Sequence, residues 1–253
     1  MTQSYSFRNF VRFAGSASLL ALTIASTGCT AACWGGKALF NGEDLSGWRS
    51  QHDGDHTWQV AGEVEMDEDD ETKLEIESGT GILVNGEGGK TINLVSEAEH
   101  GDCELHIEFM VPRGSNSGVY LMGRYEIQIL DSYGKSDEEV IFSDCGGIYA
   151  RWINDQNMEG HAPMVNASRR PGCWQSYDVV FKAPRFDAAG KKIANARFVS
   201  VCHNGKLIHK NLALNGPTRA GVLKDEGPSG PLMLQGDHGP VAFRNVWIKS
   251  LRD

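Results

Sequence analysis

The stretch GSNSGVYLMGRYEIQILDSYG, residues 114–134, has the pattern of a β-hairpin. Two apolar, β-branched runs flank Gly123, which we expect to lie in the turn. Side chains alternate between the two faces of a strand, so one face of the second strand carries Glu126 and Gln128. The opposite face carries Tyr125, Ile127 and Ile129. A slip of one residue would bury a charge, so the alternation predicts that this apolar face enters a core.

Strands of the same kind recur on both sides of this hairpin. Residues 102–111, DCELHIEFMV, alternate between apolar and polar side chains, and Asn204-Gly205 separates two further strands with a tight-turn signal. No window of about 12 residues carries a helical stripe. The pattern predicts an all-β fold, an antiparallel jelly-roll β-sandwich. Residues 38–253 contain no linker and are expected to form one domain.

The N-terminal segment is expected to be an export leader. Residues 1–28 carry Arg8 and Arg12 and no acid ahead of a short apolar run, which is typical of a signal peptide. Thr-Gly-Cys at its end resembles a lipobox and predicts lipidation of Cys29, followed by a tether over residues 29–37. Ser26 stands where an aliphatic residue is usual, so ordinary signal-peptidase cleavage remains the alternative. Either route predicts an exported protein, in the periplasm or anchored to the cell envelope.

The charge and the cysteines limit the partners. Without residues 1–28 the chain keeps 22 basic and 33 acidic residues, a net charge of −11, which repels phosphate backbones and argues against nucleic acid. Membrane association is expected only through the N-terminal lipid. Four cysteines lie within the domain and allow three pairings, between which the sequence does not choose. They are Cys103, Cys145, Cys173 and Cys202.

The polar face of the hairpin is a candidate catalytic surface. Glu126, Gln128 and Asp131 have nearly the spacing of the Glu-x-Asp-x-x-Glu strand of laminarinase-type glycoside hydrolases. The middle residue here is Gln, and Asp131 has the wrong parity to share the face of Glu126 without a β-bulge. The simpler alternative is a solvent-exposed sheet face whose charges have no function.

Residues outside the hairpin add groups suited to sugar hydroxyls. Asn116 opens the hairpin, Tyr149 lies in GGIYARW (146–152), and Gln235 and His238 lie in QGDHG (235–239). A histidine beside an aspartate at a strand end can act as a general acid or base. A surface turn holding an Asp-His pair is the alternative.

Long ordered segments resemble the 3-keto-disaccharide hydrolase family, formerly a domain of unknown function. The segments are LFNGEDLSGW (39–48), GDCELHIEFMVPRGSNSGVYLMGRYEIQILDSYG (101–134), CGGIYARW (145–152), VNASRRPGCWQSYDVVFKAPRFDAAGKKIANARF (165–198) and GPLMLQGDHGPVAFRNVWI (230–248). The resemblance implies a concanavalin A-like lectin/glucanase fold and an exported enzyme acting on 3-oxo sugars. Gly172-Cys-Trp-Gln175 departs from the usual Gly-Glu-Trp-Gln of the family.

The implied substrate changes what the polar face must do. A ketone at C3 acidifies the C2 proton, so one base can expel the group on C1 by elimination, with water added back later. We assign Glu126 or His238 as the base, Arg124 and Gln128 as ligands of the sugar oxygens, and Asp131 or His238 as the acid. Further substrate ligands are Asn116, Tyr149 and Gln235.

Several alternatives stay open at this point. Glu126 and Asp131 could instead perform direct hydrolysis, and a divalent metal could polarise the 3-oxo group, although the sequence supports no certain cofactor. The rival functions are a non-catalytic carbohydrate-binding jelly-roll module and an ordinary glycoside hydrolase of laminarinase type.

Overall fold

The computed structural model describes residues 35–251. The expected leader (1–28), the lipidation site Cys29 and most of the expected tether lie outside the described residues. Residues 35–251 form no helix. This part of the chain therefore contains no helix that could cross a membrane.

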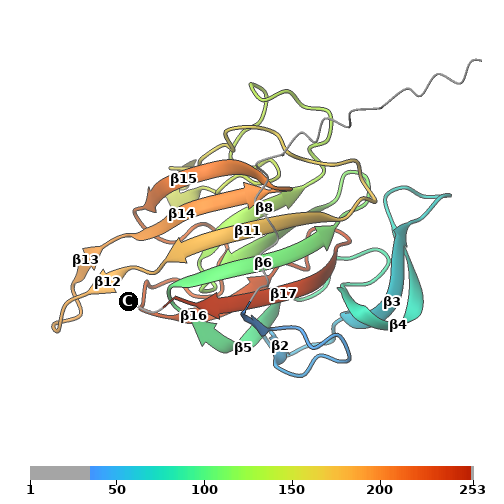
Figure 1. Ribbon diagram of the computed structural model, residues 1–253, viewed down its shortest axis with the longest axis horizontal. Helices are drawn as coiled ribbons and strands as arrows, with labels where there is room; N and C mark the ends of the chain where they lie inside the picture. The colour runs from blue at the N-terminus through green and yellow to red at the C-terminus, as the bar shows by residue number, and fades with distance from the viewer. Residues whose placement is uncertain (1–34, 252–253) are drawn as a thin grey trace, which may run out of the picture.

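The larger sheet has eight strands. They are β1 (Lys37–Ala38), β3 (Gln59–Met66), β4 (Leu74–Val84), β6 (Cys103–Met110), β11 (Gln175–Lys182), β14 (Ala196–His203), β15 (Lys206–Leu214) and β17 (Ala242–Ser250). Their order is β15-β14-β11-β6-β17-β4-β3, and β1 pairs with β17 (Figure 1). β1 includes Lys37, which the sequence pattern assigns to the tether.

The smaller sheet has five strands. They are β2 (Trp48–Ser50), β5 (Leu94–His100), β7 (Asn116–Leu121), β8 (Tyr125–Leu130) and β16 (Gly230–Leu234). Their order is β2-β5-β16-β7-β8, so the hairpin of β7 and β8 forms one edge. Two short hairpins complete the fold: β9 (Arg151–Ile153) with β10 (Gln156–Met158), and β12 (Arg185–Phe186) with β13 (Lys192–Ala194).

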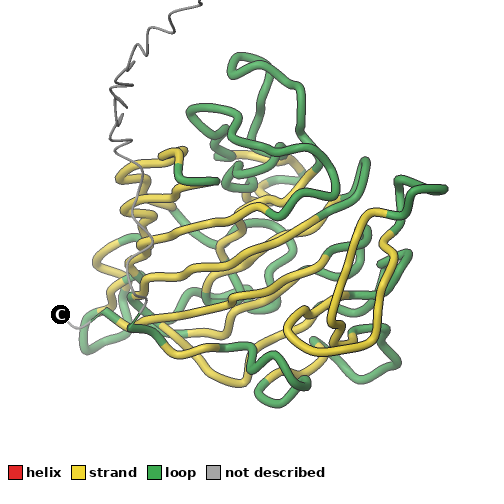
Figure 2. The backbone as a smooth tube through the Cα atoms, turned by 45° about the vertical axis from the view of Figure 1, so that its right-hand side comes forward, coloured by secondary structure: helices red, strands yellow, loops and turns green. Residues whose placement is uncertain are grey.

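The two sheets face each other as layers of a sandwich, and Figure 2 shows strands and loops only. Every pairing between adjacent strands of the two main sheets is antiparallel. The predicted all-β antiparallel jelly-roll sandwich is therefore confirmed.

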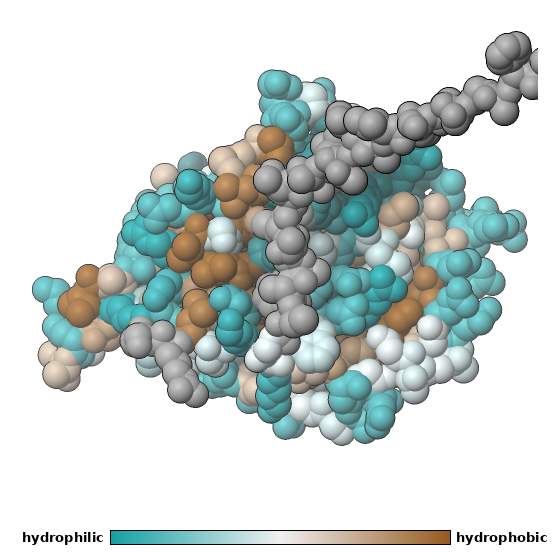
Figure 3. Space-filling model, in the orientation of Figure 1, coloured by the Kyte–Doolittle hydropathy of each residue, from teal (hydrophilic) through white to brown (hydrophobic). Residues whose placement is uncertain are grey.

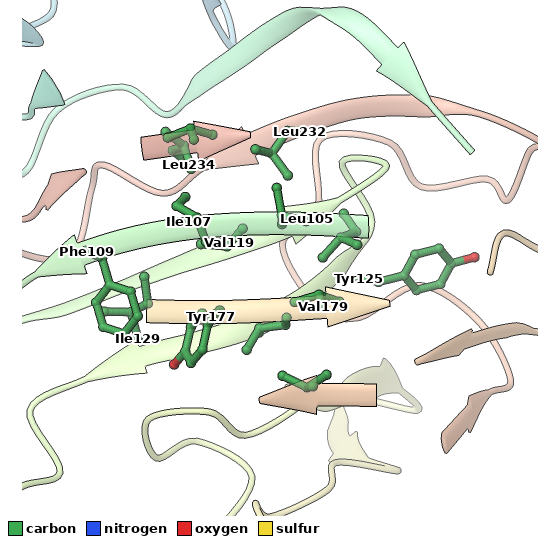
Figure 4. Close-up of a cluster of buried hydrophobic side chains, with 14 of the residues drawn as sticks. Leu105, Ile107, Phe109, Val119, Tyr125, Ile129, Tyr177, Val179, Leu232 and Leu234 are labelled. Carbon is green, nitrogen blue, oxygen red and sulfur yellow. The ribbon is translucent and has the colours of Figure 1, made fainter. Parts of the chain in front are cut away.

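Alternation along the strands fills the core between the layers (Figure 4). The larger sheet contributes fully buried residues such as Leu105, Ile107 and Phe109 of β6 and Tyr177 and Val179 of β11. The smaller sheet contributes Val119, Tyr125, Ile127, Ile129, Leu232 and Leu234. The apolar face predicted for the second strand of the hairpin is thus part of the core, which fixes the opposite face outward.

Both predicted tight turns are present. Met122 and Gly123 take positive φ angles of 52° and 62° between β7 and β8, and Asn204 and Gly205 take 50° and 77° between β14 and β15. Left-handed residues at these positions match the twist of hairpin strands.

The outer face of the larger sheet is turned toward the viewer in Figure 3, where apolar side chains gather over β11, β14 and β15. The polar face of β8 belongs to the other layer and points away from this surface, so the candidate site lies on the outer side of the smaller sheet.

Candidate active site

A cavity of about 280 Å³ opens on the outer face of the smaller sheet. Its lining residues come from the sheet and from three loops, those that follow β8, β15 and β16. They are Asn116, Tyr120, Glu126, Gln128, Tyr149, Arg219, Ala220, Gln235 and His238. Six of these nine residues are predicted site residues, from segments up to 122 positions apart in the chain. The volume is near the lower end of the roughly 300–1,000 Å³ typical of small-molecule sites.

Strand register places the carboxylate of Glu126 at the floor of this cavity. Glu126 of β8 lies opposite Tyr120 of β7, and Gln128 lies opposite Gly118. A Cβ atom at Gly118 would overlap Oε1 of Glu126 and would lie 3.1 Å from Cε2 of Tyr120. The missing side chain of Gly118 therefore provides the space that the carboxylate occupies.

Glu126 is almost completely buried, with 2% of its surface exposed. Its backbone N–H donates to Oγ1 of Thr218 at 3.0 Å, and the Thr218 hydroxyl donates to the Arg124 carbonyl at 2.9 Å. Burial raises the pKa of Glu126 to about 8, and the negative charge of Asp237 adds to this, while a hydrogen bond with the Tyr120 phenol opposes it. A carboxyl group with this pKa exchanges its proton near neutral pH.

Three amide side chains, those of Asn116, Gln128 and Gln235, line the same cavity as the carboxylate. Nε2 of Gln128 donates to Oδ1 of Asn116 at 3.1 Å. Gln235 is held by its backbone, because its N–H donates to the Gly118 carbonyl and its carbonyl accepts from Oγ of Ser117 at 2.8 Å. Oε1 of Gln235 is buried and has no hydrogen-bond partner. A buried unsatisfied acceptor that borders a polar cavity suits a ligand hydroxyl group.

His238 lies at the mouth of the cavity. Its side chain is 51% exposed, and Nδ1 lies 2.5 Å from Oδ1 of Asp237. The contact with Asp237 orients the ring, and Nε2 is the ring nitrogen outside this contact.

Two predicted site residues do not line the cavity. Arg124 is buried, and its guanidinium donates to the carbonyls of Asp225 (2.6 Å), Ser229 (2.9 Å) and Met122 (3.0 Å). The structure thus gives Arg124 a role in holding the loop after β15 and gives no support to its assignment as a sugar ligand.

Asp131 lies beyond the end of β8 and also faces elsewhere. Its Oδ2 accepts the N–H of Gly114 at 3.0 Å, and its Oδ1 accepts the N–H of Tyr133 at 3.4 Å. β7 and β8 pair in regular register from Asn116 to Leu130, so no bulge moves Asp131 onto the face of Glu126. Its assignment as the acid has no support in this geometry.

Three lining residues, Tyr120, Arg219 and Ala220, were not among the predicted site residues. Tyr120 had a usable signal, because the cross-strand partner of Glu126 follows once the three-residue turn is known. Arg219 had none: it belongs to the loop between β15 and β16 and is brought to the cavity by tertiary contacts.

Metal ligands and disulfides are the remaining expectations for the site. Within residues 35–251, no group of three or more His, Cys, Asp or Glu side chains is arranged to hold a metal ion. Cys103 and Cys145 are buried free thiols and Cys173 is an exposed one, so none of the three pairings of the four domain cysteines is complete.

A family model described as a 3-keto-alpha-glucoside-1,2-lyase-like domain matches residues 35–249. The chain belongs to this family. The resemblance inferred from the sequence motifs is thereby confirmed. No curated protein matches the chain.

Two solved structures similar to this chain come from Parabacteroides distasonis. One, provisionally assigned as a glycosyl hydrolase, is 27% identical, covers 85% of this chain and 84% of its own, and superposes with a TM-score of 0.59. A second with the same assignment is 19% identical, with 85% and 93% coverage and a TM-score of 0.52, and supports the fold alone. Together the family and the first relative make this chain a glycosyl hydrolase-like, carbohydrate-active domain.

Proposed function

We propose that this domain cleaves the glycosidic bond of 3-keto-glycosides by elimination, with Glu126 as the base that removes the C2 proton. The observation that carries the proposal is a single buried carboxylate, with a pKa of about 8, at the floor of a polar cavity of sugar size. General bases work best when their pKa lies near the working pH. The lyase chemistry in the family's description agrees with this reading.

The step balances without an oxidant or reductant. Glu126 takes the proton from C2, and the electron pair of the C–H bond enters the C1–C2 bond by way of the C3 enolate. The C1–O bond breaks, and the leaving oxygen takes a proton as the group departs. The product is a sugar with a C1–C2 double bond next to the C3 ketone, and later addition of water gives the 3-keto sugar.

The other lining groups have roles that follow from their positions. His238 at the mouth is the acid for the leaving oxygen, since its ring is oriented by Asp237 and half exposed. Arg219, which lines the cavity where Arg124 does not, supplies the positive charge for the developing enolate. Asn116, Gln128 and Gln235 bind hydroxyl groups of the ring, and Tyr149 forms the rim.

Hydrolysis by paired carboxylates fits the cavity less well. That mechanism needs two carboxyl groups at about 5–5.5 Å or about 6.5–9.5 Å across the scissile bond. Among the described residues that line the cavity, Glu126 is the one carboxylate, and Asp131 faces elsewhere. Elimination needs one base and an acid, which the cavity contains.

Release of the aglycone from an oxidised substrate tests the proposal. Purified protein is incubated with a nitrophenyl 3-keto-glucoside and with the unoxidised glucoside, and nitrophenol is followed by absorbance. We expect release from the 3-keto substrate only, and a loss of at least about a thousandfold in kcat for Glu126→Gln. Binding of sugars without release, unchanged in Glu126→Gln, would identify a carbohydrate-binding module instead.

We also propose that the protein works outside the cytoplasm, anchored to the cell envelope by lipid on Cys29. The support is the composition of residues 1–28 and the Thr-Gly-Cys sequence. Metabolic labelling with a radioactive fatty acid should mark the wild-type protein and not Cys29→Ser. Equal labelling of both, or an unprocessed protein in the cytoplasm, would contradict this proposal.

A further inference from the structure

A second cavity, of about 680 Å³, adjoins the candidate active site. Arg219 and Ala220 line both cavities, so one loop forms their common wall. The rest of the second cavity comes from that loop, the β9 strand and the end of β2. Its residues are Gln51, Arg151, Trp152, Pro217, Thr218, Arg219, Ala220, Gly221, Leu223 and Lys224.

The charges that line this second cavity are all positive. Arg151, Arg219 and Lys224 are present, and no Asp or Glu lines it. Arg151 is neutralised by Glu159, whose Oε2 lies 2.9 Å from Nη1. Within the part of the chain that the structure describes, no acidic partner lies within ion-pair distance of Arg219 or Lys224. The cavity therefore has a surplus of positive charge in a protein whose net charge is −9.

The position of Arg219 is fixed rather than free. Its guanidinium carbon lies 4.1 Å from the centroid of the Trp152 ring, a cation–π contact, and Nη1 donates to Asn157 at 3.4 Å. Trp152 itself is 49% exposed, so the ring and the cation form an open platform beside the entrance to the active site.

A third cavity shows why this surplus is unusual. The cavity of about 620 Å³ beside the β12–β13 hairpin is also lined by cations. There Lys182 and Arg185 both pair with Asp102, and Lys192 pairs with Glu226. The fourth cation there, Arg197, donates through Nη1 to the carbonyl and to Oδ1 of Asn211 rather than to a carboxylate. Three of the four positive charges in this cavity are thus neutralised within the protein, whereas those of Arg219 and Lys224 remain available to a ligand.

We infer that the cavity lined by Trp152, Arg219 and Lys224 is the subsite for the leaving group and selects a leaving group that carries a carboxylate. This rests on the proposed function, because it takes the Glu126 cavity as the site of the 3-keto ring. The acid His238 and the cation Arg219 are at the edge of that cavity, so a group on C1 extends past them over the shared wall. An aromatic or sugar ring packs on the platform, and its carboxylate reaches Lys224.

A matched pair of substrates tests the inference. The 3-keto-glucosides of 4-hydroxybenzoate and of its methyl ester share one ring and differ in one charge. The ester is the better leaving group, so intrinsic reactivity favours the neutral substrate. We expect kcat/KM to be about tenfold higher for the carboxylate, and Lys224→Glu to remove that preference by lowering kcat/KM for the carboxylate more than for the ester. Added salt at about 0.5 M should weaken the preference as well.

Two further measurements separate this inference from the proposed function. Lys210→Gln, an exposed lysine on β15, is the control and should keep the preference. The unoxidised 4-carboxyphenyl glucoside and its methyl ester are titrated into wild type and Lys224→Glu by calorimetry. Tighter binding of the carboxylate that Lys224→Glu abolishes supports the subsite, even if neither 3-keto substrate is cleaved and the proposed function fails. Absence of any preference for the carboxylate in both turnover and binding overturns the inference.

Discussion

At the scale of single residues, the position of the Glu126 carboxylate depends on Gly118, which has no side chain. Glu126 and Gly118 occupy the same outer face of the hairpin, and the carboxylate extends over the glycine. Gly118 has an ordinary strand φ angle, so the constraint is contact rather than backbone conformation. Alternation predicted the direction of Glu126 and Gln128 from the sequence. The strand register was needed to show that Gly118, which has no side chain, lies opposite Gln128.

Gly118→Ala should therefore move the carboxylate of Glu126 without unfolding the sheet. The new methyl group overlaps Oε1 of Glu126, the end of a flexible side chain, so the carboxylate shifts. A shift of about 1 Å in a reacting group can cost roughly a hundredfold in rate, and we expect a loss of that order in kcat. Gly88→Ala has open space around its Cβ and is the control. A Gly118→Ala protein with wild-type kcat would refute the placement of Glu126.

Glu126→Gln should make the protein more stable at alkaline pH. The pKa of Glu126 is about 8 in the folded protein against 4.5 as the ordinary value. Between these values the unfolded chain has lost the proton that the folded chain keeps, so wild-type stability falls as pH rises from 4.5 to 8. Gln carries no such penalty, and we expect a gain on the order of 1–3 kcal/mol near pH 8 that vanishes near pH 4. Denaturant unfolding of both proteins across this range measures it, and a gain that does not change with pH would contradict the buried, neutral carboxyl group.

At the scale of elements, the loop between β15 and β16 forms one wall of both cavities. Arg124 holds it through the carbonyls of Asp225 and Ser229, and the Tyr125 hydroxyl donates to Glu226 at 2.7 Å. The sequence placed Arg124 near the turn but could not show that its guanidinium faces carbonyls about 100 residues later in the chain. Its charge suggested a ligand, whereas its contacts make it a support for the loop that carries Arg219.

Arg124→Gln should loosen this loop and weaken substrate binding more than it slows chemistry. A buried guanidinium that donates to three carbonyls is replaced by a shorter, uncharged amide with two N–H donors. We expect KM for the 3-keto substrate to rise about tenfold and kcat to change less, with the loop more accessible to protease. Limited proteolysis reports on the loop, and steady-state kinetics separates KM from kcat. A fall in kcat at constant KM would instead mean that Arg124 contacts the reacting atoms.

At the scale of the whole molecule, the sequence predicted the sandwich well. Strict alternation in stretches such as residues 102–111, together with Asn204-Gly205, determines local strands and turns that tertiary structure does not override. The pairing order of the strands and the arrangement of loops over the outer face depend on long-range contacts. For that reason Asp131, which lies close to Glu126 in the sequence, is outside the cavity, and Arg219, which is 93 positions away, lines it.

The two-layer packing also buries histidines in neutral form. Burial lowers the pKa of His100 to about 4, of His203 to about 3 and of His209 to about 4. Nε2 of His100 accepts the N–H of Met122 at 3.1 Å, a bond that a protonated ring would lose. The unfolded chain binds protons below its ordinary pKa of 6.5 while the folded chain does not, so stability falls with acidification below pH 6.5.

His100→Gln should reduce this acid sensitivity, because Gln keeps an acceptor for Met122 and does not titrate. Between about pH 7 and about pH 5, we expect the variant to lose on the order of 1–2 kcal/mol less stability than wild type. Chemical denaturation at the two pH values measures the difference. Identical pH dependence in the two proteins would show that His100 titrates equally in the folded and unfolded states.

The central claim, removal of the C2 proton by Glu126, is tested most directly by following that hydrogen. Wild type and Glu126→Gln are incubated with a 3-keto-glucoside in deuterium oxide, and proton NMR records the C2 signal alongside the freed aglycone. The account predicts that wild type releases the aglycone and gives a 3-keto sugar with deuterium at C2, while Glu126→Gln does neither. Release of the aglycone by wild type with the original hydrogen retained at C2 would contradict it.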